Sequence, residues 1–472
     1  MRSAGVSGAA LIAAAALSFS LAVPAPADDD IDALFDDPAS TEVVEAQTIE
    51  DPASTVVEDS GVVWGGKFDS KLETNYAWKD FPDSGDRIVD GAEGVDFSVA
   101  ATLHFDVRPD SDFRVFGKFT TEFPFHTDTA PNNIRIFELF SDFNIDRKVY
   151  FRFGKQTASW GLSRFYQLAD PLSVAVKDPQ IPDADLEGPL ALKASLPFAG
   201  NTLFAYLVAK ESYLPGDLAE TTISDLGYGL KGDFLIRVPE NPISGDAELS
   251  AAAYYQKELA PALTLGLSTN IGKVQVFTDQ VLTWGLNRFR LTDDAVYDPE
   301  LGQIYGTGKA DEGWFYAASA GFSYVESDHH LSIYGEYFYD GSGSTDDAYL
   351  EKLANRYVWE MDPAHPKSLS ILDLASYQSA HNTTLYVLLD EPFGADDWSA
   401  SVFWQANWVD LSGLVIPTLV FAPNSRVEVS AGCRLAYGDD HDEFIVKTTN
   451  PSSLEASRAS VFIAARLGMG SF

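Results

Sequence analysis

The sequence predicts an all-β chain, a transmembrane antiparallel up-and-down β-barrel of about 18 strands, with 16 as the alternative count. From Trp64 onward, apolar and polar side chains alternate with the period of two that is typical of β-strands. The connections between these runs alternate in length along the chain. Beyond the first 27 residues, no stretch is apolar for the roughly 18 residues that a membrane-crossing helix needs.

The run 95–107 shows the alternation clearly, because its seven odd-numbered positions are all apolar. A run of 13 residues suits a tilted membrane strand, which needs about 9–11 residues. Similar runs predict strands at 64–78, 95–107, 113–124, 134–145, 149–157, 189–197, 202–210, 225–238, 247–257, 261–271, 273–284, 314–326, 331–340, 383–391, 398–409, 414–421, 426–438 and 458–469.

Connection length separates a membrane barrel from a soluble sandwich, which alternation alone does not. The even-numbered connections are short, as at 146–148 and 327–330. Membrane barrels have short periplasmic turns and longer external loops, whereas a sandwich has no reason to sort its loops in this way. The long connections are odd-numbered, notably 158–188, 285–313, 341–382 and 439–457.

Two segments precede the predicted barrel, which we place at 61–472. Arg2, the apolar stretch 9–23 and the small residues at 25–27 predict a secretory signal peptide over 1–27. Residues 28–60 hold twelve acidic residues and no basic ones, so we expect a disordered segment. It is either a solvated spacer or an acidic tether that partly occupies the barrel mouth.

Composition argues against several classes of function. A formal net charge of −38 leaves no basic face for nucleic acid. Cys433 is the only cysteine, so neither a disulfide framework nor a cysteine metal cluster is expected. The sequence lacks a His-x-x-x-His pair, a nucleophile elbow and a Gly-rich phosphate loop. We therefore expect no catalytic residues, no cofactor and no metal, and predict that the chain is not an enzyme.

The signal, the alternation, the connection lengths and the terminal Phe472 together resemble Gram-negative and spirochaetal outer-membrane porins. The resemblance covers 64–472. It implies a place in the bacterial outer membrane, reached by export through the inner membrane, with outer-membrane lipid and the barrel assembly machinery as partners. Because trimers are common in the class, an oligomer is compatible with this resemblance.

The polar faces of the strands predict a wet lumen whose wall carries charges of both signs. A motif at 160–165, Trp-Gly-Leu-Ser-Arg-Phe, returns at 284–289 with Asn in place of Ser. Either its Trp lies at the membrane interface and its Phe anchors a loop, or its arginines project into the pore. Candidate pore-lining residues are Lys67, Lys71, Glu73, Arg114, Lys118, Glu122, Arg152, Arg164, Arg288, Glu428 and Arg434, and candidate interface aromatics are Trp64, Trp78, Trp160, Trp284, Trp314 and Trp398.

These features predict a channel for passive diffusion of small hydrophilic solutes, with a modest cation preference that follows from the acidic composition. Two alternatives remain open: a structural or adhesin-like barrel with a plugged lumen, and a substrate-specific uptake channel. The long connection 341–382 either folds inward and narrows the pore or lies outside as a lid.

Overall fold

The computed structural model describes most of the region predicted as a barrel. The described residues are 62–78, 94–124, 133–158, 160–166, 168–172, 179–180, 188–209, 223–237, 244–257, 259–287, 289–298, 303–309, 312–348, 350–351, 379–440, 442–446, 456–468 and 470–471. The predicted signal peptide, the acidic segment, Arg288 and Phe472 lie outside them, as does most of 341–382.

Most described residues lie in β-strands and very few in helices, as predicted. Its strands are β1 (Val62–Trp78), β2 (Gly94–Asp110), β3 (Phe113–Phe123), β4 (Ile134–Ile145), β5 (Val149–Lys155), β6 (Leu190–Phe198), β7 (Asn201–Val208), β8 (Gly227–Ile236), β9 (Ser244–Tyr255), β10 (Ala262–Ile271), β11 (Val274–Trp284), β12 (Phe289–Asp298), β13 (Gln303–Lys309), β14 (Trp314–Glu326), β15 (Leu331–Asp340), β16 (His381–Asp390), β17 (Trp398–Asn407), β18 (Gly413–Asn424), β19 (Val427–Tyr437), β20 (Ala459–Leu467) and β21 (Gly470–Ser471). Short helical turns are η5 (Ile223–Asp225), η6 (Ser327–His329), η7 (Pro392–Gly394) and α5 (Glu443–Val446).

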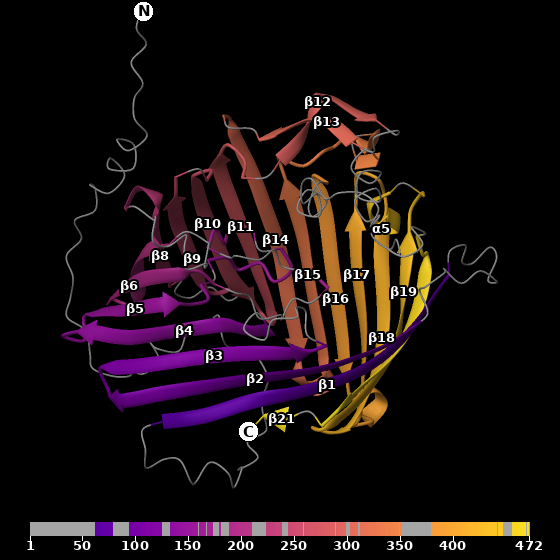
Figure 1. Cartoon of the computed structure of the whole chain (residues 1–472), viewed down its shortest axis with the longest axis horizontal. Helices are drawn as coiled ribbons and strands as arrows, with labels where there is room; N and C mark the ends of the chain where they lie inside the picture. The colour runs from indigo at the N-terminus through magenta and orange to yellow at the C-terminus, as the bar shows by residue number, and fades with distance from the viewer. Residues whose placement is uncertain are drawn as a thin grey trace, which may run out of the picture.

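The strands form one closed antiparallel barrel (Figure 1). Each barrel strand pairs with its neighbours in the chain, and β20 returns to β1, where Trp78 faces Ala459 and Leu72 faces Ala465. The two residues of β21 continue this pairing with β1. Counting β20 and β21 together gives 18 strands, which confirms the predicted fold and excludes 16.

One long connection contains structure that the sequence analysis missed. Within 285–313, β12 and β13 pair only with each other and extend beyond the ends of β11 and β14 (Figure 1). Their register shifts between Leu291 and Val296, so the alternation is interrupted within the hairpin. A short interrupted run of this kind carries little of the period-two signal on which the strand prediction depends.

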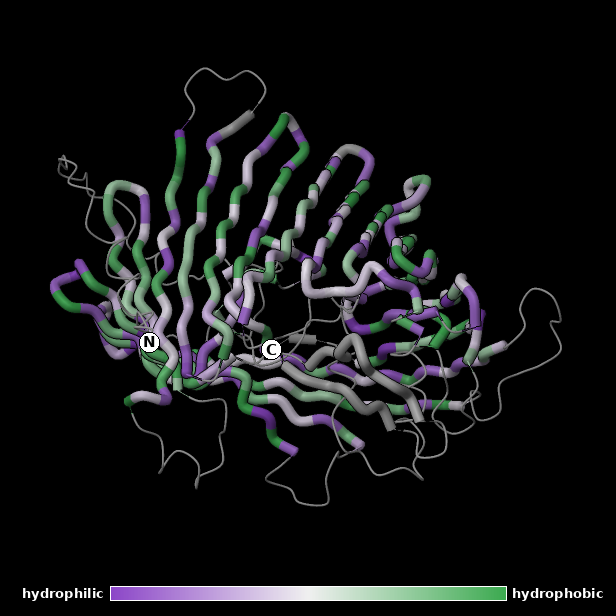
Figure 2. Tube along the Cα trace, turned by 90° about the horizontal axis from the view of Figure 1, so that it is seen from above, coloured by the Kyte–Doolittle hydropathy of each residue, from purple (hydrophilic) through white to green (hydrophobic). Residues whose placement is uncertain are grey.

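Hydrophobic and hydrophilic residues alternate along the strands (Figure 2), and the outer face of the barrel carries large exposed apolar side chains. On β10, Leu263, Leu265 and Leu267 are 50%, 42% and 40% exposed, and Thr264 between them is buried. Large apolar side chains exposed around a closed barrel form the band that lipid covers in membrane barrels. Within the described residues, no helix is both long and apolar enough to cross a bilayer.

Several of the predicted interface tryptophans lie on this outer surface. Trp64, Trp314 and Trp398 are 65%, 60% and 39% exposed, and Trp284 packs edge-on against Trp314 at 5.1 Å between ring centroids. Trp78, the last residue of β1, is half-buried. The interface assignment is wrong for Trp160, which is 3% exposed and packs inside the barrel.

Candidate functional site

The connection after β5 does not stay outside the barrel, although its length predicted an external loop. Its base is tied to the start of β6: Gln156 donates its backbone N–H to the Pro189 carbonyl at 3.2 Å and its Nε2 to the Ala191 carbonyl at 2.9 Å. The described residues of 156–172, which are 156–158, 160–166 and 168–172 and are here called the inserted segment, then run along the inner wall. Their contacts extend from β5 as far as β17.

Trp160 is the first anchor of the inserted segment. Its indole packs against Tyr206 on β7 at 5.2 Å and against Tyr254 on β9 at 6.1 Å between ring centroids. Gly229 on β8 lies opposite both tyrosines in the register. A Cβ at Gly229 would come within 2.8 Å of the indole, so the absence of a side chain there makes room for Trp160.

Asp279, in the middle of β11, holds the next two residues. Its Oδ2 accepts hydrogen bonds from the backbone N–H groups of Leu162 at 2.7 Å and Ser163 at 2.8 Å, and from the Ser163 hydroxyl at 2.8 Å. The same hydroxyl also hydrogen-bonds the Ser319 hydroxyl on β14. Asp279 is fully buried beneath these contacts.

Glu336, in the middle of β15, holds the three residues that follow. Its Oε2 accepts the backbone N–H groups of Arg164 at 3.0 Å and Phe165 at 3.1 Å, and its Oε1 accepts that of Tyr166 at 3.3 Å. Glu336 is 2% exposed. Two wall carboxylates therefore bind five consecutive backbone N–H groups, those of residues 162–166.

Aromatic packing completes the contact with the far wall. Tyr166 stacks on Phe338 at 4.8 Å between ring centroids, and its hydroxyl hydrogen-bonds the Thr384 hydroxyl at 2.8 Å. Phe165 meets Phe403 edge-on at 6.3 Å. Both inserted rings are 1% exposed, so the segment buries apolar surface as well as hydrogen bonds.

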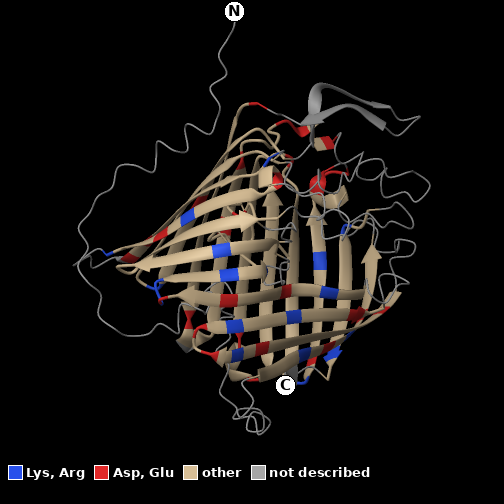
Figure 3. Ribbon diagram, turned by 60° about the vertical axis from the view of Figure 1, so that its left-hand side comes forward, with Lys and Arg blue, Asp and Glu red and all other residues tan. Residues whose placement is uncertain are grey.

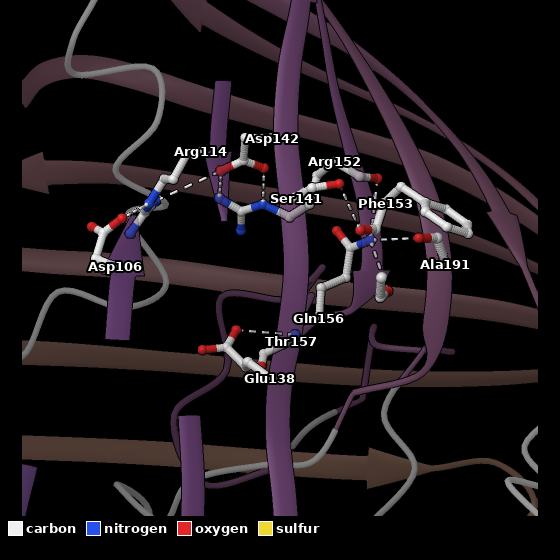
Figure 4. A network of polar contacts seen from close by, with 11 residues as sticks. Asp106, Arg114, Glu138, Ser141, Asp142, Arg152, Phe153, Gln156, Thr157 and Ala191 are labelled. Carbon is white, nitrogen blue, oxygen red and sulfur yellow. Dashed lines mark hydrogen bonds and ion pairs between the residues drawn. The ribbon is translucent and has the colours of Figure 1, made fainter. Parts of the chain in front are cut away.

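The inner faces of β2–β5 carry a chain of paired charges (Figure 4). Arg152 binds Asp142 with its Nε at 2.8 Å and its NH2 at 3.2 Å. Arg114 donates its Nε to Asp106 at 3.0 Å and places its NH1 3.7 Å from Asp142. The guanidinium groups also lie over Phe140, that of Arg152 at 4.0 Å from the ring centroid. The rings and the carboxylates hold these arginines along the wall.

Charges of opposite sign lie close together elsewhere on the inner face as well, and Figure 3 shows charged residues on neighbouring strands. Arg466 on β20 lies 3.5 Å from Glu428 and 3.8 Å from Asp69, and Lys71 pairs with Glu73. In the described part of the chain, no group of three or more His, Cys, Asp and Glu side chains is placed to hold a metal ion.

The register places nine predicted pore-lining residues on the face that carries Asp142, Asp279 and Glu336: Lys67, Lys71, Glu73, Arg114, Lys118, Glu122, Arg152, Glu428 and Arg434. Lys118 directly faces Glu138 on β4. Arg164 belongs to the inserted segment rather than to a strand.

The two carboxylates that bind the segment, Asp279 and Glu336, are not among the residues that the sequence singled out. A usable signal was present, because each is an acidic residue at mid-strand whose direct cross-strand partners are uncharged, Gly266 and Ser319 for Asp279 and Gly321 and Thr384 for Glu336. A lone acid at mid-strand on such a face calls for a partner from elsewhere in the chain.

Comparisons with known proteins add solved structures but no family. No protein-family model matches the sequence, and a search of curated proteins finds no match. The structure is similar to Pseudomonas aeruginosa OccK3 (OpdO), at 11% identity and a TM-score of 0.44 over 86% of this chain and 95% of that one. It is also similar to P. aeruginosa OccK11 (OpdR), at 9% and 0.42 over 86% and 96%, and to P. aeruginosa OpdK with vanillate, at 9% and 0.42 over 86% and 99%.

Proposed function

We propose that the chain is a porin-type channel of the bacterial outer membrane through which small hydrophilic solutes diffuse passively. The observation that carries the proposal is a closed barrel of 18 strands whose outer face is apolar and whose inner face is charged and partly covered by the inserted segment. Barrels of 16–18 strands have a lumen too wide for wall side chains alone to fill.

The route we propose lies between the inserted segment and the charged wall. The carboxylates and buried rings that hold the segment belong to β7–β17. Charged side chains gather on β1–β5 and β19–β20. A solute that passes between the two meets fixed charges on one side and peptide and aromatic groups on the other. Such an arrangement discriminates by size and dipole.

Ion selectivity of this route is expected to be weak. The inner cations lie beside carboxylates, as Arg152 does beside Asp142 and Arg466 beside Glu428. Paired charges produce a smaller net field than isolated ones. The net charge of −38 still favours cations at the entrances, so a modest cation preference stays a prediction. Lipid contact, assembly by the barrel machinery and oligomer formation belong to the same proposal.

Planar-bilayer recording of the purified, folded protein tests this function. We expect steady ion conductance with a small reversal potential in a salt gradient. Folded protein that inserts into the bilayer without any conductance would contradict the proposal and favour the structural barrel with a plugged lumen. Deletion of 28–60 separates these cases further, because a barrel plugged by its acidic segment gains conductance and an open barrel does not.

A substrate-specific uptake channel is distinguished by competition. One solute that reduces the ion current at low concentration, while solutes of similar size and charge do not, indicates a binding site in the route. A general diffusion channel shows no such difference. The same purified protein and the same bilayer serve for both measurements.

A further inference from the structure

We infer that Asp279 and Glu336 are positioning residues that fix the inserted segment on the inner wall, and that they make Arg164 the charged group that this segment presents to passing solutes. The inference rests on the proposed channel function. It assigns a task to two carboxylates on β11 and β15, away from the charge chain of β2–β5.

The backbone hydrogen bonds of the segment depend on the two carboxylates. Residues 162–166 direct five consecutive backbone N–H groups at Asp279 and Glu336, at 2.7–3.3 Å. Ionised carboxylates only accept hydrogen bonds, and they accept several at once. Without them, these N–H groups would be buried against the wall unpaired, at a cost of about 1–3 kcal/mol each. The carboxylates therefore determine where this stretch of chain lies.

The wall beneath the segment is shaped to bring the chain close to Asp279. A Cβ added at Gly266 on β10 would lie 3.0 Å from one Asp279 oxygen, and one added at Gly161 of the segment would lie 2.9 Å from the other. Strand β10 and the inserted segment thus both approach the Asp279 carboxylate at a glycine, which has no side chain. The docking is built into the strand as well as into the segment.

Arg164 remains partly accessible when the segment is docked. Ser163 is 9% exposed, and Phe165 and Tyr166 are 1% exposed, whereas Arg164 between them is only half-buried. Its guanidinium carbon lies 4.1 Å from the ring centroid of Tyr334, on the same strand as Glu336. The N–H groups of the two residues before Arg164 bind Asp279, and those of Arg164 and the two residues after it bind Glu336. The backbone of Arg164 is therefore held in one position.

The decisive substitution is Glu336→Gln. Oε2 of Glu336 accepts two N–H groups and Oε1 accepts one, whereas the Gln amide nitrogen is a donor and cannot accept at the position that it takes. We expect the segment to leave the wall part of the time, which gives a higher and fluctuating single-channel conductance. Asp279→Ala, which removes the oxygen that accepts the Leu162 and Ser163 hydrogen bonds, is expected to act in the same direction. The matched control is Glu326→Gln, which removes one charge where Glu326 pairs with Lys273 at the end of β14 and which should conduct like the wild type.

A covalent link provides the rescue. Because the Ser163 and Ser319 hydroxyls are in direct hydrogen-bond contact, cysteines at these two positions bring their sulfur atoms within reach of a disulfide. In a Cys433→Ser background, oxidised Ser163→Cys/Ser319→Cys should return the Glu336→Gln channel to wild-type conductance. Reduction should abolish the rescue. A variant that is merely misfolded would not recover.

Arg164→Gln tests the second half of the inference. It should shift the reversal potential towards cations when Glu336 is present, and by much less in the Glu336→Gln background, because a detached segment no longer holds Arg164 in the route. Equal shifts in both backgrounds would overturn the assignment of Arg164. Wild-type conductance in both Glu336→Gln and Asp279→Ala would overturn the role of the carboxylates.

Chemical labelling separates a failure of this inference from a failure of the channel function. In the Cys433→Ser background, Ser163→Cys is buried against Ser319, so a water-soluble maleimide should react with it slowly and react faster when Glu336→Gln is added. The measurement needs no ion current. If Glu336→Gln leaves the labelling rate unchanged, the anchoring by Glu336 is contradicted, even in a barrel that does not conduct. If Glu336→Gln increases the rate, the anchoring is supported even in such a barrel.

Discussion

Arg152 on β5 and Asp142 on β4 form a two-point contact across adjacent strands, with Nε 2.8 Å from Oδ1 and NH2 3.2 Å from Oδ2. Arg114 approaches the same carboxylate from β3, at 3.7 Å from Oδ2. One buried carboxylate therefore lies between two arginines that are themselves largely covered, with side chains 12% and 16% exposed. The charge balance of this part of the lumen depends on Asp142.

Asp142→Asn should make the channel more selective for anions. The substitution leaves two guanidinium groups facing each other across a neutral side chain, so the local potential becomes positive. Removing one partner of a buried ion pair also costs about 3–5 kcal/mol in the free energy of unfolding. Reversal potentials in a salt gradient test the first effect and urea unfolding in lipid vesicles the second. Asp112→Asn, in an exposed turn with Arg147, is the control, and an equal shift there would contradict the assignment.

Leu265→Arg should destabilise the barrel in a bilayer. Leu265 lies at the middle of β10 on the outer face and is 42% exposed. An arginine that faces lipid at the membrane midplane costs about 2–4 kcal/mol in a transmembrane barrel. Gln275→Arg is the matched control, since Gln275 is exposed on the inward face of β11. Equal losses in the free energy of unfolding would contradict the assignment of the two faces.

The strands and their number were predictable because each strand carries its own signal. The run 95–107 alternates over 13 residues, and the structure extends it only to Gly94–Asp110. The turn after Ile145 and the one after Glu326 begin where they were predicted. In a barrel every strand has one face on lipid and one on the lumen, so the period-two pattern reports the fold locally and needs no knowledge of distant contacts.

The candidate site was less predictable because it is made of contacts between distant parts of the chain. Arg164 was identified as a pore residue, yet its position depends on Glu336, which is 172 residues away in the chain. Trp160 and Trp284 occupy the same place in one motif but opposite environments, since Trp160 is buried and Trp284 is 41% exposed. A local motif does not contain the docking surface that separates these two outcomes.

Gly229→Ala should destabilise the protein although the change is small. A Cβ at this position would lie 2.8 Å and 3.0 Å from two atoms of the Trp160 indole, which fills the space between Tyr206 and Tyr254. Overpacking of this kind typically costs about 1–3 kcal/mol in the free energy of unfolding. Gly94→Ala is the control, because a Cβ there meets nothing within 4 Å. A Gly229→Ala protein as stable as Gly94→Ala would show that Trp160 moves aside freely.

Asp442, in the connection between β19 and β20, predicts a pH dependence outside the barrel wall. Burial raises its pKa to about 6, and the nearby carboxylates of Asp410, Asp439 and Asp347 add to this effect. Because the folded-state pKa lies above the ordinary value of 3.8, folding of this connection favours the protonated form. The local stability that this provides is present at low pH and is lost as pH rises from about 3.8 to about 6.

Hydrogen exchange of the amides of Glu443–Val446 measures this effect. After correction for the intrinsic pH dependence of exchange, protection should be greater at low pH than at neutral pH. At neutral pH the Asp442 carboxylate is charged, and this charge opposes the packing of Phe444 and Ile445. Asp442→Asn keeps the size of the side chain and removes its titration, so its protection should vary little over the same range. Equal pH dependence in both proteins would contradict the assignment of this effect to Asp442.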